Sequence, residues 1–289
     1  MEISTHTVTS VDGTTIGYQR IGSGPALVIV PGNNRMAHNY DRLATALADE
    51  YTVCIIERRG RGNSGPQGAN YSIEREVEDL SAVATAVHAT AVFGHSYGGL
   101  VALAAAASTS LFGRVSAYEP AISIGHSFDL EFRAEFAALL DRGKHVRAMT
   151  LFFHATRLIP LPYPLIYLLS VLFVGRPGEM RSLMPTTAPE LEVVAQADGD
   201  GSQYASIRAE TLLIGGTKAP SYLLDVLDPL CRIIPNSSRL TVPGADHNAP
   251  DESMPADFAE VLRPFLVLLD RAGEQRSHKA PLEDQENNE

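Results

Sequence analysis

Short apolar runs alternate with amphipathic stretches along most of the chain. Residues 2–11 and 14–21 alternate apolar and polar side chains, and Asp12-Gly13 between them is a strong hairpin-turn signal. The fully apolar run 26–30 is typical of a strand buried in a parallel sheet. Further predicted strands lie at 51–56, 91–93, 114–118, 211–215 and 239–242. Predicted helices lie at 36–48, 72–87, 100–107, 221–234 and 256–271. This alternation predicts an α/β fold with a doubly wound, mostly parallel sheet.

The pattern changes between residues 122 and 205, where strand signals vanish. Helical periodicity at Phe132, Phe136, Leu139 and Leu140 gives way to a proline-rich apolar segment over 151–174. This stretch is predicted to be a helical insertion between the strands that end at 118 and begin at 211. The predicted core therefore comprises residues 1–121 and 206–273, and the polar, mostly acidic residues 274–289 are predicted to be a disordered tail.

Composition narrows the class of protein. A chain of 289 residues that is 45% hydrophobic can bury one large core, and a net charge of −11 argues against nucleic acid or an anionic membrane as partner. The two cysteines are far apart, and no metal-type spacing of His and Cys occurs, so no metal is expected. The N-terminus lacks a signal peptide, which predicts a cytoplasmic protein. Prolines interrupt the first half of the uncharged stretch 158–175, and the apolar part that follows them is too short to span a membrane.

The segment Gly94-His95-Ser96-Tyr97-Gly98 stands between a predicted strand and an alanine-rich helix. This is the G-x-S-x-G pattern of a sharp turn that exposes a serine hydroxyl. The strained turn lifts the hydroxyl clear of the sheet and sets it at a helix N-terminus, where backbone N–H groups can stabilise an oxyanion. Ser96 is therefore predicted to be a nucleophile.

At these residues the chain resembles the α/β-hydrolase superfamily. The segment Arg59-Gly60-Arg61-Gly62-Asn63-Ser64 is similar to the R-G-x-G-x-S loop common in that superfamily. The resemblance implies an α/β-hydrolase fold in which the insertion 122–205 is a helical cap. It also implies His247 as the base that activates Ser96, because His247 follows the last predicted strand in the Ser…acid…His order.

The position of the acid departs from the usual pattern. Where the superfamily most often has an aspartate, the loop 215–220 has Lys218. Glu119 ends the strand after the serine turn, where haloalkane dehalogenases and zearalenone-type lactonases of this superfamily have the acid. From there a glutamate can reach His247 Nδ1, so Glu119 is the predicted acid, with Asp225 and Asp246 as alternatives.

The oxyanion hole needs two N–H donors. One is predicted to be Tyr97, the residue after the nucleophile. By resemblance, the loop after the first parallel strand supplies the other, which is Asn33 or, as the close alternative, Asn34.

A serine at the turn implies attack on a carbonyl carbon. The predicted function is hydrolysis of an ester or lactone through a Ser-His-Glu triad and an acyl-enzyme, without a cofactor. The predicted partner is a small apolar ester or lactone, and the aromatic residues of the insertion favour a bulky acyl or aromatic group in it; they are Phe152, Phe153, Tyr163, Tyr167 and Phe173. Cofactor-free C–C hydrolysis or lyase chemistry (with Lys218 if it faces the pocket), acyl transfer and receptor-like binding remain alternatives. The sequence leaves a homodimer open.

Overall fold

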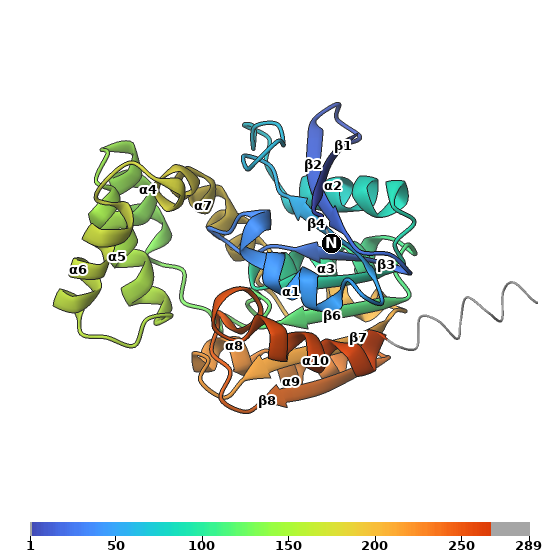
Figure 1. The fold of residues 1–289 in the computed structure, drawn as a ribbon. Helices are drawn as coiled ribbons and strands as arrows, with labels where there is room; N and C mark the ends of the chain where they lie inside the picture. Colours follow the sequence, from blue (N-terminus) through green and yellow to red (C-terminus); the bar gives the residue numbers. More distant parts are fainter. Residues whose placement is uncertain (1, 267–289) are drawn as a thin grey trace, which may run out of the picture.

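The computed structural model describes residues 2–266, so the predicted tail 274–289 and the end of the predicted core lie outside it. Eight strands form one sheet in the order β1-β2-β4-β3-β5-β6-β7-β8 (Figure 1). They are β1 (Ser4–Thr9), β2 (Thr15–Ile21), β3 (Ala26–Val30), β4 (Thr52–Glu57), β5 (Ala91–His95), β6 (Arg114–Tyr118), β7 (Glu210–Gly216) and β8 (Ser237–Val242). The predicted hairpin β1–β2 pairs antiparallel, β2 pairs antiparallel with β4, and the other neighbouring strands are parallel. The expected mostly parallel sheet is confirmed.

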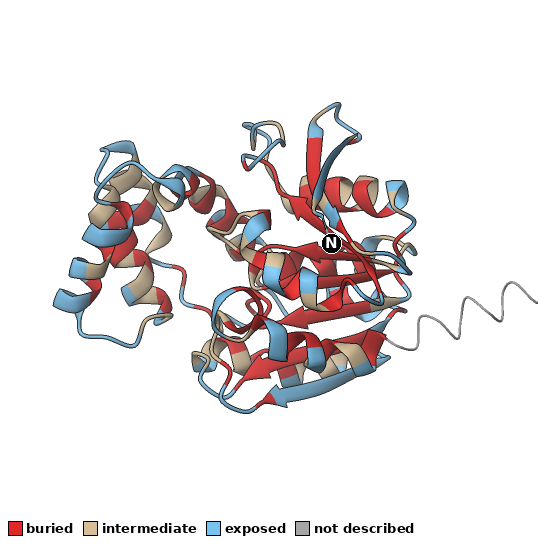
Figure 2. Cartoon of the chain, in the orientation of Figure 1, coloured by how far each residue is buried: buried red, intermediate tan, exposed pale blue. Residues whose placement is uncertain are grey.

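Helices cover both faces of the sheet (Figures 1 and 2). Leu27 and Ile29 of β3 pack with α1 (Asp41–Leu47) and α10 (Pro255–Leu266). The alternate side chains Val28 and Val30 join the core formed with three helices of the other face. Those are α2 (Ile73–Ala86), α3 (Tyr97–Ser108) and α9 (Leu227–Ile233). The period of two in the strand therefore supplies apolar contacts to both helical layers.

Four further helices lie between β6 and β7 in the chain. They are α4 (Arg133–Asp141), α5 (His145–Thr156), α6 (Tyr163–Val174) and α7 (Glu179–Gln196). In Figure 1 they form a group beside the sheet, with α7 nearest the sheet and α6 at the outer edge. The sequence pattern did not predict α7, which contains Pro185 and Pro189. Within residues 2–266, no helix is long and apolar enough to cross a membrane.

Two predicted helices differ in detail from the structure. The predicted helix 36–48 begins with a 3₁₀ turn, η1 (Ala37–Tyr40), before α1. The predicted helix 221–234 is divided into α8 (Ser221–Asp225) and α9 around Val226. Two short 3₁₀ and π segments complete the described chain, η2 (Ser202–Ser206) and η3 (Ala249–Ser253). These differences concern helix ends and leave the layers unchanged.

Candidate active site

Ser96 lies in a tight turn between β5 and α3, with φ 54° and ψ −119°. A side chain at either flanking glycine would collide with backbone: a Cβ on Gly94 would lie 2.2 Å from Gly98 O, and one on Gly98 would lie 2.0 Å from Val30 O. The Ser96 N–H donates to Tyr118 O at 2.9 Å, which ties the turn to the end of β6. A non-glycine residue held at positive φ by its surroundings is a strained conformation of the kind that gathers at functional sites.

Glu119 follows β6 directly and is fully buried, also at positive φ (46°). Its Oε1 accepts the Gly216 N–H at 2.9 Å, and its Oε2 lies 2.6 Å from Nδ1 of His247. His247 stands in the loop after β8, and its side chain is 11% exposed. The carboxylate therefore holds the Nδ1–H tautomer and leaves Nε2 without a proton.

The two alternative acids point elsewhere. Asp225 is exposed on α8. Asp246 Oδ1 accepts the Asn248 N–H at 3.0 Å and the Ser253 hydroxyl at 2.7 Å. Lys218 is exposed and is absent from the residues that line the cavities around Ser96. Of the carboxylates predicted from the sequence, the structure brings Glu119 to His247 Nδ1.

His95, beside the serine, links three segments by hydrogen bonds. Its Nε2 lies 2.8 Å from the His247 carbonyl oxygen, which fixes Nε2 as the donor. Its Nδ1 then accepts the Tyr40 hydroxyl at 2.7 Å, and the Tyr40 oxygen accepts the Gly32 N–H at 3.0 Å. Burial and the neighbouring His247 lower the pKa of His95 well below its usual range, so the ring is neutral. Tyr40 was not predicted as a site residue, because nothing in the sequence distinguishes it from the other buried aromatic residues.

Ser96 and His247 line a cavity of about 520 Å³. Its apolar wall comes from the helical insertion and comprises Met149, Phe152, Phe153, Leu158, Ile159, Phe173 and Met180. Its polar wall comes from the core and includes Asn33, Asn34, Arg35, Asn39, Asn248, Asp251 and Glu252. The predicted Phe152 and Phe153 reach the cavity, whereas Tyr163 and Tyr167 are exposed on α6 and do not line it.

A smaller cavity of about 40 Å³ adjoins the first, because both are lined by Asn33, Ser96 and His247. Tyr97 also lines the smaller one. As the first residue of α3, Tyr97 has a backbone N–H outside the helical hydrogen-bond ladder. Asn33 follows Gly32, whose ideal Cβ would lie only 3.2 Å from Ser96 Cβ. The structure thus brings both predicted oxyanion-hole residues to the serine.

The Asn33 side chain is tied to the insertion. Its Nδ2 donates to Oε2 of Glu190, a buried residue of α7, and Thr187 of the same helix donates to Asn34 Oδ1 at 2.9 Å. Arg61 Nη2 lies 2.6 Å from Glu190 Oε1, and Arg58 also pairs with that oxygen. Sequence reasoning missed Glu190. The available signal was the run of arginines in the loop after β4, because buried guanidinium groups need carboxylate partners.

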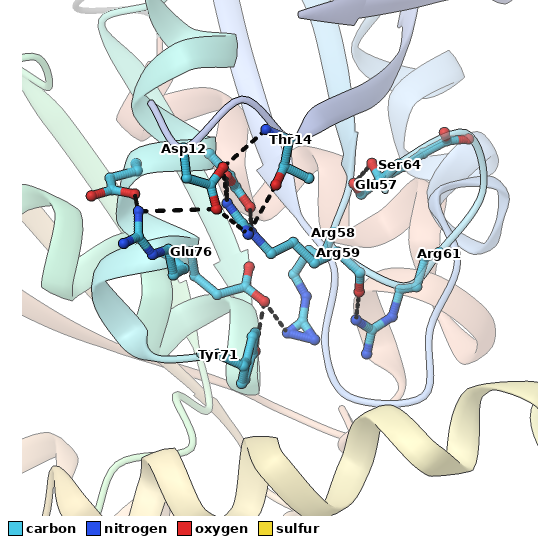
Figure 3. Close-up of polar contacts among 12 residues, drawn as sticks. Asp12, Thr14, Glu57, Arg58, Arg59, Arg61, Ser64, Tyr71 and Glu76 are labelled. Carbon is cyan, nitrogen blue, oxygen red and sulfur yellow. Dashed lines mark hydrogen bonds and ion pairs between the residues drawn. The ribbon is translucent and has the colours of Figure 1, made fainter. Parts of the chain in front are cut away.

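The arginine loop fixes the neighbouring segments as well (Figure 3). Arg59 pairs with Asp12 of the β1–β2 turn at 2.7 Å and with Asp79 of α2 at 2.5 Å. Arg58 lies 3.6 Å from Glu76 and 4.5 Å from the centroid of the Tyr97 ring. The loop therefore connects the hairpin, α2, α7 and the start of α3.

Asp251 in the polar wall pairs with Arg35 and is almost fully buried. Burial raises the pKa of Asp251 to about 6, against the opposing effect of Arg35. Among residues 2–266 there is no group of three or more His, Cys, Asp or Glu side chains that could hold a metal ion.

Comparisons with known proteins agree with the geometry. The sequence model of the alpha/beta hydrolase family matches residues 27–261. The crystal structure of an alpha/beta hydrolase from Sphaerobacter thermophilus DSM 20745 is similar with a TM-score of 0.78 and 31% identity, over 90% of this chain and 100% of that one. The expected α/β-hydrolase fold is confirmed.

Curated relatives match over shorter stretches. The uncharacterized hydrolase YraK of Bacillus subtilis (strain 168) is 34% identical over 97 residues, which is 32% of this chain and 36% of YraK. A fluoroacetate dehalogenase from Burkholderia sp is 41% identical over 63 residues, or 20% of this chain and 21% of that protein. The chain thus spans about a third of the length of YraK and about a fifth of the length of the dehalogenase.

Proposed function

The chain belongs to the alpha/beta hydrolase family, and from this premise we propose that it is a serine hydrolase that cleaves an ester or lactone of an apolar substrate. The observation that carries the proposal is the 2.6 Å contact between Glu119 Oε2 and His247 Nδ1, beside a serine held in a strained turn on the cavity wall. A protein that only binds a ligand does not need a serine, a histidine and a glutamate arranged in this way, because together they serve to activate the serine hydroxyl.

In this mechanism His247 Nε2 takes the proton of the Ser96 hydroxyl as Oγ attacks the substrate carbonyl. Glu119 holds the imidazole and stabilises the imidazolium that forms. The backbone N–H groups of Asn33 and Tyr97 donate to the oxyanion. His247 then protonates the departing alkoxide, leaving an acyl-enzyme on Ser96. A water molecule, deprotonated by His247, attacks the acyl carbon, and His247 returns the proton to Ser96 Oγ as the bond to the acyl group breaks and the acid is released.

The shape of the site supports an apolar substrate with one polar end. The insertion supplies an apolar wall containing Phe152 and Phe153, and the core supplies asparagines and Arg35 opposite it. Only a short group fits the smaller cavity of about 40 Å³, whereas the cavity of about 520 Å³ accommodates the larger part of a substrate. We therefore expect esters with a short group on one side of the scissile carbonyl to be preferred.

The test is hydrolysis of p-nitrophenyl esters of increasing acyl length and of aromatic lactones by wild type and by Ser96→Ala. We expect turnover by wild type and a loss of about 10⁴-fold or more in the variant. Ser116→Ala is the matched control, because Ser116 is buried in β6 away from both cavities. Turnover unchanged in Ser96→Ala, or none by wild type on any ester or lactone, would contradict the proposal.

A further inference from the structure

Helix α6 presents an unusually apolar surface to solvent. Eight of the ten exposed large hydrophobic side chains among residues 2–266 lie between 161 and 173. They are Leu161, Tyr163, Leu165, Tyr167, Leu168, Val171, Leu172 and Phe173. The helix lies at the outer edge of the insertion, away from the sheet (Figure 1), and much of its surface is exposed in Figure 2. A contiguous exposed patch of this kind marks an interaction surface, because soluble monomers rarely leave one uncovered.

The charge around α6 is opposite in sign to that of the whole chain. Residues 142–181 contain six basic side chains and a single acidic one, Glu179, in a chain whose net charge is −11. The basic residues are Arg142, Lys144, Arg147, Arg157, Arg176 and Arg181. Within the described part of the chain none of these six is in an ion pair, while Glu179 lies 3.3 Å from His38. The free positive charge and the exposed apolar helix therefore belong to one segment.

We propose that the α6 face docks on an anionic lipid surface. An apolar helix that lies in the headgroup region, with basic residues at its ends, gains both apolar burial and attraction to acidic lipids. Arg157 precedes α6 and Arg176 follows it, and both are exposed. The acidic charge of the rest of the chain does not oppose this contact, because charges more than about 8 Å apart are screened at physiological ionic strength and the sheet domain lies beyond the insertion (Figure 1).

A second copy of the chain fits this face less well. A twofold interface sets the same patch against itself and would bring the two sets of unpaired arginines together. The lipid surface instead matches both the apolar and the basic groups. The docking face also adjoins the active-site cavity, because Phe173 is 44% exposed and lines that cavity as well. A docked molecule would thus hold this side of the cavity at the lipid surface.

The test is sedimentation of the full chain with vesicles made of equal parts phosphatidylcholine and phosphatidylglycerol, and with vesicles of phosphatidylcholine alone. Wild type is expected to bind the anionic vesicles and to be released by salt. Arg157→Gln/Arg176→Gln should weaken binding about 25-fold, since each basic residue near an anionic surface contributes about fivefold. Leu168→Gln/Leu172→Gln should weaken it about 100-fold, at about tenfold for each leucine withdrawn from the interface.

Two controls match these variants. Val11→Gln replaces the most exposed large hydrophobic side chain outside the α6 face, and Arg42→Gln removes an exposed arginine of α1; both should bind as wild type does. All six substituted sites are exposed, and an unchanged unfolding temperature shows that each variant folds. The proposal is overturned if wild type does not bind anionic vesicles or binds both vesicle types equally. It is also overturned if the α6 variants bind anionic vesicles as strongly as wild type does. Sedimentation equilibrium that shows a dimer lost in Leu168→Gln/Leu172→Gln, without vesicle binding, would assign the face to a second copy instead.

Discussion

At the scale of single residues, the site depends on buried polar groups that hold the proposed catalytic ones. The hydrogen bonds from Gly32 through Tyr40 and His95 to the His247 carbonyl join the two loops on either side of Ser96. Tyr40 and His95 are buried, so the loss of a partner leaves an unsatisfied donor or acceptor away from water. The same logic explains why Glu119 accepts the Gly216 N–H with its second oxygen.

Tyr40→Phe tests the hydrogen-bond chain that runs from Gly32 through Tyr40 and His95 to His247. The variant leaves the Gly32 N–H without its acceptor and His95 Nδ1 without its donor, which is expected to lower the free energy of unfolding by about 1–3 kcal/mol. It should also reduce kcat with little change in KM, because the loop that carries Asn33 loses its anchor while the cavity walls remain. Urea unfolding and steady-state kinetics measure the two effects. Stability and kcat equal to wild type would show that the link has no role.

Asp251 makes stability depend on pH. Its pKa is raised from 3.8 to about 6 in the folded chain, so the folded state holds the proton more tightly than the unfolded state. The stabilisation that this residue contributes is therefore present at low pH and lost as pH rises through about 6. We expect the free energy of unfolding of wild type minus that of Asp251→Asn to fall by about 2 kcal/mol from about pH 4.5 to about pH 7.5. A value that rises over this range would contradict the assignment.

At the scale of elements, α7 connects the insertion to the core. Glu190 reaches Arg58 and Arg61 of the loop after β4 and Asn33 of the loop after β3, so one carboxylate connects two loops of the core to α7. Both arginines and Glu190 are buried. A buried ion pair adds little over an apolar contact, but breaking it leaves an uncompensated charge in the interior.

Glu190→Gln is therefore expected to destabilise the chain by about 3–5 kcal/mol. The matched control is Glu192→Gln on the same helix, whose carboxylate is 49% exposed and lies 3.0 Å from Arg133. A pair that exposed should cost less than about 1 kcal/mol when broken. Chemical denaturation compares the two variants. Equal, small effects would mean that Arg58 and Arg61 find other partners or water.

The sequence pattern predicted the sheet, its hairpin and most helices, because the inner strands are apolar runs and Asp12-Gly13 marks the hairpin turn. It predicted a helical insertion over 122–205 but did not place α7 within it, because Pro185 and Pro189 usually interrupt a helix; here packing against the core overrides that preference. The structure also brings Ser96, Glu119 and His247 together, in agreement with their predicted grouping, while their catalytic roles remain predictions. Glu190 could not be found from the sequence, because its partners lie more than a hundred residues away and burial is a property of the fold.

At the scale of the whole molecule, the net charge of the chain differs in sign from the charge of one of its segments. The net charge of −11 describes the chain as a whole, yet the segment 142–181 is basic and contains the apolar helix α6. The expectation that an acidic chain avoids anionic membranes therefore does not extend to this segment. The core and the insertion meet at the cavity beside Ser96, where the insertion supplies the apolar wall and the core supplies Ser96 and His247.

The measurement that tests the central claim most directly is covalent labelling by a fluorophosphonate, followed by intact-mass and peptide mass spectrometry. We expect wild type to gain one adduct on Ser96 and Ser96→Ala to gain none. Glu119→Gln should label at least about 10²-fold more slowly, because its imidazole loses the carboxylate that orients it, whereas Asp225→Asn, which changes an exposed carboxylate, should label at the wild-type rate. Labelling of wild type at another residue, or equal rates in Glu119→Gln and wild type, would contradict the Ser96–His247–Glu119 triad.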